Sequence, residues 1–169
     1  APGQQEDWVA TVPAPNGYSG PFRAPGDGRL GEHYAACLDE AIGELHDRER
    51  TVGAFFVDSI YTSDGIVVAP DGYLGSAWRR VRAAGGLCIA DEVQAGFGRT
   101  GAAMWGFEQQ GVVPDIVTLG KPMGNGHPLA AVVTTPEIAE RFAERRYYFN
   151  TFGGNPVSCA VGLAVLETI

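Results

Sequence analysis

Four short apolar runs constrain the fold of this chain more than any other feature. They occupy residues 53–58 (GAFFVD), 87–91 (LCIAD), 115–119 (DIVTL) and 129–134 (LAAVVT). Strands that are apolar throughout are typical of parallel sheets with both faces covered. Helical patterns over 32–46, 73–84, 136–146 and 156–169 supply the covering helices. We therefore expect an α/β fold of three layers: a mostly parallel sheet with helices on both faces. Residues 1–31, rich in proline and glycine, are expected to be irregular, with one short strand at 8–12.

Length and charge exclude several classes of protein. The chain of 169 residues can bury the core of one domain, and its net charge is −8. This negative charge argues against binding to nucleic acid or to an anionic membrane surface. No run approaches the roughly 20 apolar residues of a membrane span. The three cysteines, Cys37, Cys88 and Cys159, fit buried free thiols in a reducing cytoplasm better than a disulfide framework. No metal-ligand spacing occurs, so we expect no metal site.

The two ends of the sequence indicate a piece of a longer protein. The chain opens at Ala1 without an initiator methionine. It closes in an apolar helical run, 161–169, that has neither a C-terminal glycine nor a basic last turn. We interpret residues 1–169 as an internal fragment.

Lys121 is the only lysine in a chain that otherwise uses eleven arginines. An amine can lose its proton, attack a carbonyl and form an imine, which a guanidinium cannot do. Codon bias that left a single surface lysine is the alternative explanation. Asp58, Asp91 and Lys121 each lie just beyond a predicted strand end, and ligands of parallel sheets bind at this edge.

Asp91 follows four apolar residues, so its carboxylate needs a cation or a hydrogen-bond donor. The protonated ring nitrogen of a cofactor would serve, and the alternatives are a helix N-cap or a structural pair with arginine. The glycine-rich loop 96–101 has the wrong spacing for a phosphate loop. We expect it to be a structural turn in which Arg99 pairs with Glu92 or a nearby carboxylate.

Residues 150–156 (NTFGGNP) precede the last predicted helix. Thr151 and the backbone amides could hold a phosphate, or the segment is an ordinary helix entry with Asn155 as N-cap. His127 is expected to be structural. The aromatic residues Trp105, Phe107 and 147–149 are expected to be buried.

The segment 89–101 (IADEVQAGFGRTG), followed by 114–121 (PDIVTLGK), resembles the signature of class III aminotransferases. These are pyridoxal-phosphate enzymes of fold type I. The resemblance extends over essentially the whole chain, and it implies part of the large, cofactor-binding domain of a homodimer with shared active sites. It also implies that the upstream part of this domain and a C-terminal small domain are missing. The fragment alone is then expected to bind the cofactor poorly and to be inactive.

The resemblance assigns a role to five residues. Lys121 forms the covalent link to pyridoxal phosphate and shuttles protons. Asp91 pairs with the pyridinium nitrogen, Val93 presses against one ring face, and Gln94 lies near the phenolic oxygen. Thr151 reaches the cofactor phosphate of the neighbouring subunit.

The segments 120–128 (GKPMGNGHP) and 149–162 (FNTFGGNPVSCAVG) are similar to the phospho-lyase branch of this family, which acts on O-phosphoethanolamine and phosphohydroxylysine. This branch releases phosphate, an aldehyde and ammonia. An ω-amino acid or amine aminotransferase is the alternative, and a non-catalytic assembly segment is a third reading. Asp58 stands where most relatives have glutamate, which leaves its role in the site open.

Overall fold

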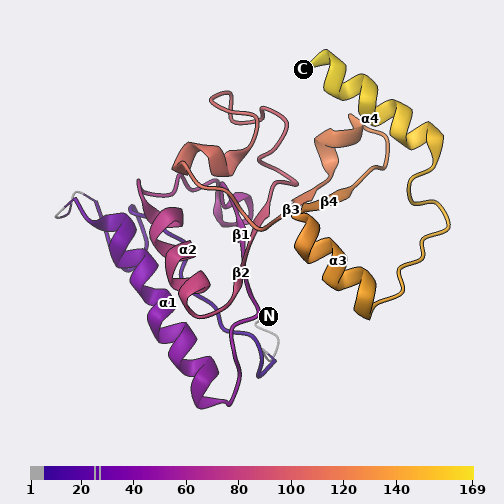
Figure 1. Cartoon of the computed structure of the whole chain (residues 1–169). Helices are drawn as coiled ribbons and strands as arrows, with labels where there is room; N and C mark the ends of the chain where they lie inside the picture. The colour runs from indigo at the N-terminus through magenta and orange to yellow at the C-terminus, as the bar shows by residue number, and fades with distance from the viewer. Residues whose placement is uncertain (1–5, 25, 27) are drawn as a thin grey trace.

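From residue 30 onward, the chain forms helices and strands in the order that the sequence predicts (Figure 1). The computed structural model describes residues 6–24, 26 and 28–169. Its strands are β1 (Ala54–Asp58), β2 (Leu87–Asp91), β3 (Ile116–Leu119) and β4 (Ala131–Thr134). Its helices are α1 (Leu30–Asp47), α2 (Tyr73–Ala83), α3 (Pro136–Arg145) and α4 (Pro156–Thr168), and short 3-10 turns are η1 (Thr62–Asp64), η2 (Gly106–Gln110) and η3 (Lys121–Gly124).

The four strands form one sheet in the order β1-β2-β3-β4. Strands β1, β2 and β3 run parallel, and β4 pairs with β3 in the antiparallel direction. The expected α/β fold, with a mostly parallel sheet and flanking helices, is confirmed. The antiparallel β4 follows from its short connection, because parallel neighbours need a long crossover.

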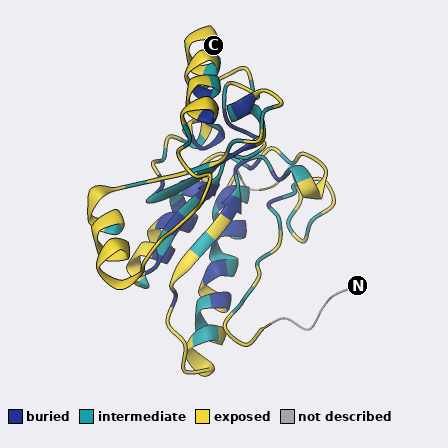
Figure 2. Ribbon diagram, turned by 90° about the vertical axis from the view of Figure 1, so that its right-hand side faces the viewer, coloured by how far each residue is buried: buried dark blue, intermediate teal, exposed yellow. Residues whose placement is uncertain are grey.

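The hydrophobic core lies where α2 packs between α1 and the strands β1 and β2 (Figure 2). Leu74 and Cys88 are fully buried there, and Trp78 is 1% exposed. Burial raises the pKa of the Cys88 thiol to about 12. Tyr34 of α1 is also fully buried, and its hydroxyl donates to the carbonyl oxygen of Asn16 (2.7 Å). This bond holds the N-terminal segment against α1.

An ionic cluster joins the outer faces of α1 and α2. Arg80 of α2 contacts Glu32 (2.5 Å) and Asp39 (3.1 Å) of α1. The Ser76 hydroxyl also donates to Glu32. Hydrogen bonds from Ser76 and then Arg80 lower the pKa of Glu32 below its ordinary value of 4.5. The cluster therefore favours the ionised carboxylate in the folded chain.

The expected strand at residues 8–12 is wrong. These residues form no strand in the structure. The carbonyl oxygen of Val9 accepts from the Arg48 side chain (3.3 Å) rather than from a neighbouring strand. A strand is defined by its ladder partner, and alternation in the sequence does not supply one.

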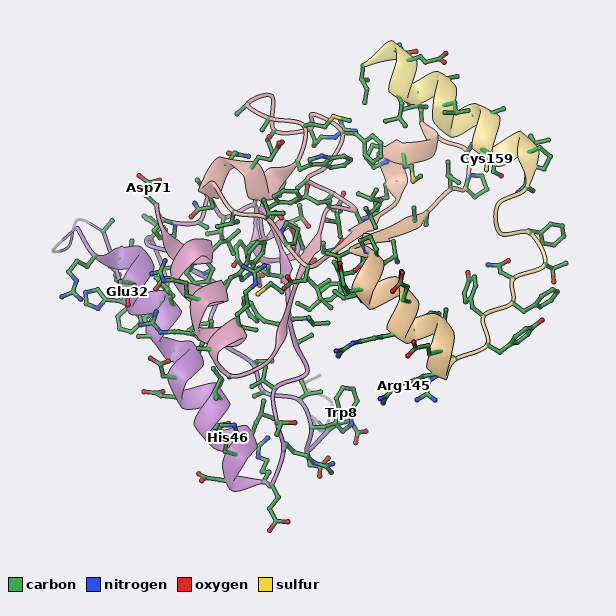
Figure 3. The ribbon with its side chains drawn as sticks, in the orientation of Figure 1. Trp8, Glu32, His46, Asp71, Arg145 and Cys159 are labelled. Carbon is green, nitrogen blue, oxygen red and sulfur yellow. The ribbon has the colours of Figure 1, made fainter. Side chains whose placement is uncertain are left out.

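Several large apolar side chains that we expected to be buried are exposed. The aromatic residues Tyr147, Tyr148 and Phe149 are 92%, 69% and 71% exposed, which contradicts their expected burial. Cys159, labelled on α4 in Figure 3, is likewise exposed and Cys37 is intermediate, so only Cys88 is a fully buried thiol. The open surface comprises one side of β1, both sides of the middle of β4, α3, the 147–152 segment and α4 (Figure 2). None of the described helices combines the length and apolar character that crossing a membrane requires.

The core predicts a large effect of truncation at α2. Leu74→Ala removes buried methyl groups between α1 and the sheet, and it should lower the free energy of unfolding by about 2–5 kcal/mol. Val68→Ala, at a side chain that is 84% exposed, is the control and should change it by less than about 0.5 kcal/mol. Urea unfolding followed by tryptophan fluorescence measures both. Equal midpoints for the two variants would contradict the described core.

The ionic cluster predicts a pH dependence of stability. Because the folded-state pKa of Glu32 is lowered, its stabilisation is present above about pH 4.5 and is lost as the pH falls through the lowered pKa. Glu32 is partly exposed, so the contribution should stay below about 1 kcal/mol. Glu32→Gln should therefore differ most from wild type near neutral pH, and the difference should shrink on acidification. Urea titrations over this pH range measure it, and two parallel stability curves would contradict the cluster.

Candidate active site

The carboxyl ends of the parallel strands bring polar side chains to one edge of the sheet. The strand register aligns Asp58 of β1 with Asp91 of β2, and Asp91 with Thr118 of β3. Lys121 follows Thr118 by three residues and begins η3. The structure therefore places Asp91 and Lys121 at the same edge, on the ends of neighbouring strands.

Asp91 is held by two hydrogen bonds through one of its carboxylate oxygens. Oδ1 accepts from the Thr118 hydroxyl (3.1 Å) and from the Val93 amide (3.0 Å). The second oxygen, Oδ2, has no hydrogen-bond partner among the described residues. Asp91 is neither a helix N-cap nor paired with an arginine in the described chain, because a turn follows it and both its donors are uncharged. One oxygen is thus fixed and the other is available to a ligand.

Lys121 has a backbone conformation that residues other than glycine rarely adopt. Its φ is 35°, in the left-handed region, which costs of order 1 kcal/mol or more for a residue with a side chain. Hydrogen bonds within η3, from the Met123 amide to Gly120 (2.9 Å) and from Asn125 to Pro122 (3.0 Å), hold the turn. The turn presents the Lys121 side chain to solvent at the end of β3.

A cavity of about 650 Å³ lies beside Lys121 and is also lined by Val93, Gly120 and the loop 126–130. Gly120 faces Val93: a Cβ built on this glycine would lie 3.5 Å from both Val93 methyl groups. Val93 and Lys121 thus line the same space, while Asp91 lies two residues before Val93. The cavity has the apolar wall and the single amine that a flat aromatic ring with a carbonyl group requires.

The structure does not bring the other two predicted cofactor residues into this cavity. Gln94 is exposed, one residue beyond Val93. Thr151 is exposed in the loop before α4, and no hydrogen bond joins it to Asp91 or Lys121 in the described part of the chain. Asn155 caps α4, because its Oδ1 accepts from the Ser158 amide (2.9 Å) and Pro156 opens the first turn. The helix-entry reading of this segment is therefore confirmed, and the phosphate role of Thr151 stays a prediction.

His127 links the Lys121 turn to α4. Its Nε2 lies 2.8 Å from the Ser158 hydroxyl, which also accepts from the Asn155 side-chain amide (2.9 Å). Gly162, one turn further along α4, packs so closely on Leu129 that an added Cβ would lie 2.8 Å from a leucine methyl. The structural role expected for His127 agrees with these contacts.

Asp58 is engaged in its own turn. Its carboxylate accepts from the amides of Ile60 (3.0 Å) and Thr62 (2.8 Å) and from the Thr62 hydroxyl. These bonds order the loop after β1. They leave the carboxylate committed to the turn rather than aimed at the Lys121 cavity.

Glu92 is the residue that sequence reasoning missed. It is fully buried, and its carboxylate accepts from the Ser59 hydroxyl (2.5 Å) and from the amides of Gly106 (2.7 Å) and Phe107 (3.1 Å). The expected pair between Arg99 and Glu92 is wrong, because the buried carboxylate is saturated by these donors. The only signal in the sequence was the position of Glu92 directly after Asp91 at the strand end. That position does not reveal which groups donate hydrogen bonds to Glu92.

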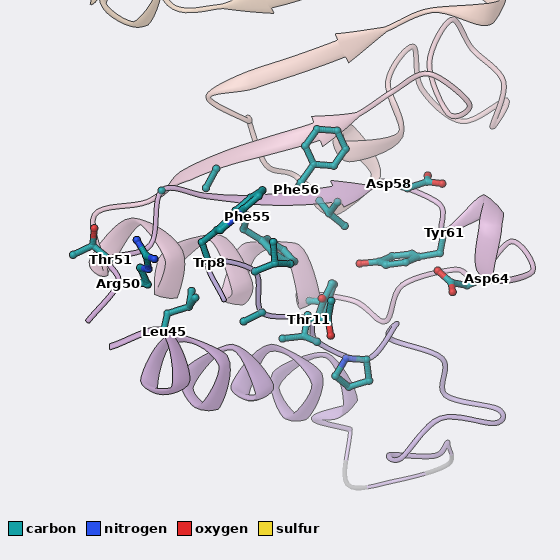
Figure 4. Close-up of a pocket in the computed structure, with 18 of the residues that line it drawn as sticks. Trp8, Thr11, Leu45, Arg50, Thr51, Phe55, Phe56, Asp58, Tyr61 and Asp64 are labelled. Atoms are coloured by element: carbon teal, nitrogen blue, oxygen red, sulfur yellow. The ribbon is translucent and has the colours of Figure 1, made fainter. Parts of the chain in front are cut away.

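A second, larger cavity of about 1010 Å³ lies away from Lys121 (Figure 4). Figure 4 shows it beneath β1, between Phe55 on the strand, Trp8 in the N-terminal segment and Leu45 on α1. Its walls are mainly apolar side chains and backbone, and it contains no lysine. Size alone would favour this cavity, but the amine lines the other one, at the sheet edge where Asp91 ends the neighbouring strand.

Comparison with known proteins agrees with this edge-of-sheet site. The aminotransferase class-III family profile matches residues 8–169. An alanine–glyoxylate aminotransferase 2-like protein of Drosophila melanogaster is 48% identical over 166 residues, covering 96% of this chain and 34% of that protein. The human mitochondrial alanine–glyoxylate aminotransferase 2 is 55% identical over 120 residues, covering 71% of this chain and 23% of that protein.

Solved structures show the same fold. A phospholyase from Arthrobacter, solved in complex with phosphoethanolamine, superimposes with a TM-score of 0.82 at 46% identity, covering 93% of this chain and 36% of that one. An (S)-enantioselective ω-transaminase from Thermomicrobium roseum gives 0.81 at 36% identity, covering 92% and 35%. The chain thus spans about a third of the length of these relatives. The match over nearly all of its residues shows that the chain belongs to the class-III aminotransferase family.

Proposed function

We propose that this chain is the central part of a pyridoxal-phosphate-dependent phospho-lyase that releases phosphate from O-phosphoethanolamine-like amines. The family assignment supports the cofactor, and amines are the substrates typical of the family. The observation that carries the choice of branch is the 46% identity, over 93% of this chain, to the Arthrobacter phospholyase solved with phosphoethanolamine. The segments 120–128 and 149–162, which resemble the phospho-lyases, support the same choice, and the His127–Ser158 hydrogen bond joins them.

The residues at the sheet edge fit pyridoxal phosphate. The cofactor needs a primary amine for its aldehyde carbon, a carboxylate for its protonated ring nitrogen and an apolar surface for its ring. Lys121, the free Oδ2 of Asp91 and the Val93 side chain are of these types, at adjoining strand ends. When bound, the cofactor withdraws electrons from the carbon that carries the substrate amine.

The chain's own residues would divide the remaining work. Asp91 would hold the proton at the ring nitrogen, because a fixed carboxylate stabilises the cation. Lys121 would attach the cofactor and would accept the proton of the amine-bearing carbon. Val93 would hold one ring face, and Gln94, whose exposed side chain lies outside the cavity, would have to turn toward the phenolic oxygen. The overall reaction would consume water and release phosphate, ammonia and the aldehyde.

Assembly and location complete the proposal. Thr151 is exposed on a loop, as a residue that reaches a neighbouring subunit must be. A homodimer with shared active sites, an upstream phosphate-binding segment and a C-terminal small domain would supply the rest of the site. The free cysteines support a cytoplasmic location. On this view the 169-residue chain alone binds the cofactor weakly and is inactive.

Transamination is the second candidate, because relatives at 48% and 55% identity are alanine–glyoxylate aminotransferases. It shares the roles of Lys121 and Asp91 but returns the proton to the cofactor and needs a keto acid. A third candidate is an assembly segment without catalysis. The exposed faces of α3, α4 and β4 offer contact surfaces for the rest of the protein under all three candidate functions.

The proposal predicts turnover without a keto acid. The complete protein that contains this chain should release phosphate and acetaldehyde from O-phosphoethanolamine when pyridoxal phosphate is the only other addition. Phosphate and aldehyde assays measure this. Lys121→Arg keeps the charge but cannot form an imine, so it should abolish release. Activity that needs a keto acceptor would support the transaminase, and normal turnover in Lys121→Arg would overturn both enzymatic candidates.

We expect Asp91→Asn to lower kcat by a larger factor than it changes KM. The amide keeps an oxygen for Thr118 and Val93 but removes the charge that stabilises the ring cation, so kcat should fall roughly 10²–10³-fold. Steady-state kinetics of the complete protein measure kcat and KM separately. Asp71→Asn, at an exposed position, is the control and should match wild type. A kcat for Asp91→Asn close to that of wild type would contradict the assigned role.

A further inference from the structure

Glu92 occupies an unusual position for a carboxylate. It is fully buried, and its three hydrogen-bond partners, Ser59, Gly106 and Phe107, are all uncharged. Burial raises the pKa of Glu92, and the three donors offset only part of that effect. Burying a carboxylate among uncharged donors costs folding free energy, so we expect its hydrogen bonds to serve a structural purpose. None of the roles assigned above uses it.

The donors come from two loops that are distant in the sequence. Ser59 directly follows Asp58 at the end of β1, and Gly106 and Phe107 begin η2. The Glu92 amide donates to the Thr118 carbonyl oxygen (2.9 Å) at the end of β3. Residue 92 therefore ties together the chain after β1, the start of η2 and the end of β3.

The packing around this carboxylate leaves no room for displacement. A Cβ on Gly106 would lie 2.8 Å from the Cβ atoms of Ser59 and Ala95 and 3.3 Å from Glu92 Oε1. A Cβ on Gly96 would lie 2.8 Å from the Glu92 carbonyl oxygen. Glycine is thus required where the backbone amide of Gly106 approaches Glu92, and the site is closed on all these sides.

Strand β2 ends at Asp91, and side chains alternate along a strand, so the Glu92 side chain points to the face opposite to that of Asp91. Asp91 is oriented by the Val93 amide, which is the peptide immediately after Glu92. Fixing the Glu92 carboxylate therefore fixes the peptide that orients Asp91. Rotation of residue 92 would move this peptide and with it the hydrogen bond from the Val93 amide that holds Asp91.

We propose that Glu92 is a positioning residue: its buried carboxylate holds the loop after β1 against the start of η2 and thereby aims the Asp91 carboxylate at the cofactor ring nitrogen. This inference rests on the proposed function for the identity of the ring. The clamp itself is a property of the apo chain.

Glu92→Gln tests the clamp with little change in shape. Two backbone N–H groups point at the two different oxygens of Glu92, so the glutamine NH₂ must face one of them in either orientation. Glu108→Gln is the matched control: Glu108 is exposed in the same turn and accepts the Trp105 amide (2.9 Å) through one oxygen, so glutamine can keep that bond. Amide hydrogen exchange of the complete apo protein measures the result. The Gly106 and Phe107 amides should exchange roughly tenfold faster than in wild type in Glu92→Gln, and at the wild-type rate in Glu108→Gln.

The effect on Asp91 is tested by binding two cofactors to the complete protein. One is pyridoxal phosphate, and the other is its 1-deaza analogue, in which carbon replaces the ring nitrogen. Glu92→Gln should lower the affinity for pyridoxal phosphate roughly tenfold and leave the affinity for the analogue nearly unchanged. Asp91→Asn should have the same selective effect. The double variant should lose little more than Asp91→Asn alone, because both changes remove the same interaction. If Glu92→Gln does not fold, Ser59→Ala can take its place. It removes one donor to the Glu92 carboxylate and should weaken pyridoxal phosphate binding in the same selective way, but to a smaller extent.

The outcomes separate the two proposals. Equal losses for both cofactors, additive losses in the double variant, or unchanged exchange at Gly106 and Phe107 would overturn the positioning role and leave the proposed function intact. A wild-type protein that binds neither cofactor would overturn the proposed function and this role with it, while the exchange result would still decide whether the clamp exists.

Discussion

The parallel pairing of β1, β2 and β3 is the constraint on which the rest of the molecule depends. Parallel strands start and end on the same sides, so one register brings Asp58, Asp91 and Thr118 to one level. The same pairing requires long crossovers, and the α2 crossover supplies the largest share of the core. Core and site are therefore not independent: the apolar residues that bury the strands also determine which polar residues meet at their ends.

At this edge, the two chemically capable groups are held in opposite ways. Asp91 is fixed by hydrogen bonds from Thr118 and Val93 and keeps one oxygen open. Lys121 extends from a turn at positive φ into solvent. This division suits the proposed chemistry, in which the acid must hold one charge in place while the amine forms, leaves and re-forms a bond. The buried Glu92, behind Asp91, provides the rigidity on one side only.

Sequence reasoning predicted the parts of this fold that depend on local pattern. The apolar runs at 87–91 and 115–119, followed by Asp91 and Lys121, gave the strands and the edge, because burial on both faces leaves a signature in the chain itself. Contacts between distant segments left none. Glu92 was assigned to Arg99, since nothing local reveals that Ser59 and Gly106 reach it. The strand at 8–12 and the burial of 147–149 failed for the same reason: both depend on a neighbour, and sequence pattern does not specify it.

The choice between elimination and transamination depends on a different part of the chain from the choice of cofactor. On the proposed function, the strand ends supply the groups for the cofactor, and both reactions need Lys121 and Asp91 alike. The segments that resemble the phospho-lyases lie on η3 and at the start of α4, and His127 and Ser158 join them (2.8 Å). Because His127 follows the Lys121 turn, we expect changes on α4 to affect the position of the amine. Specificity for the leaving group would then vary while the strand ends stay the same, which is consistent with both phospho-lyases and transaminases among the relatives of this chain.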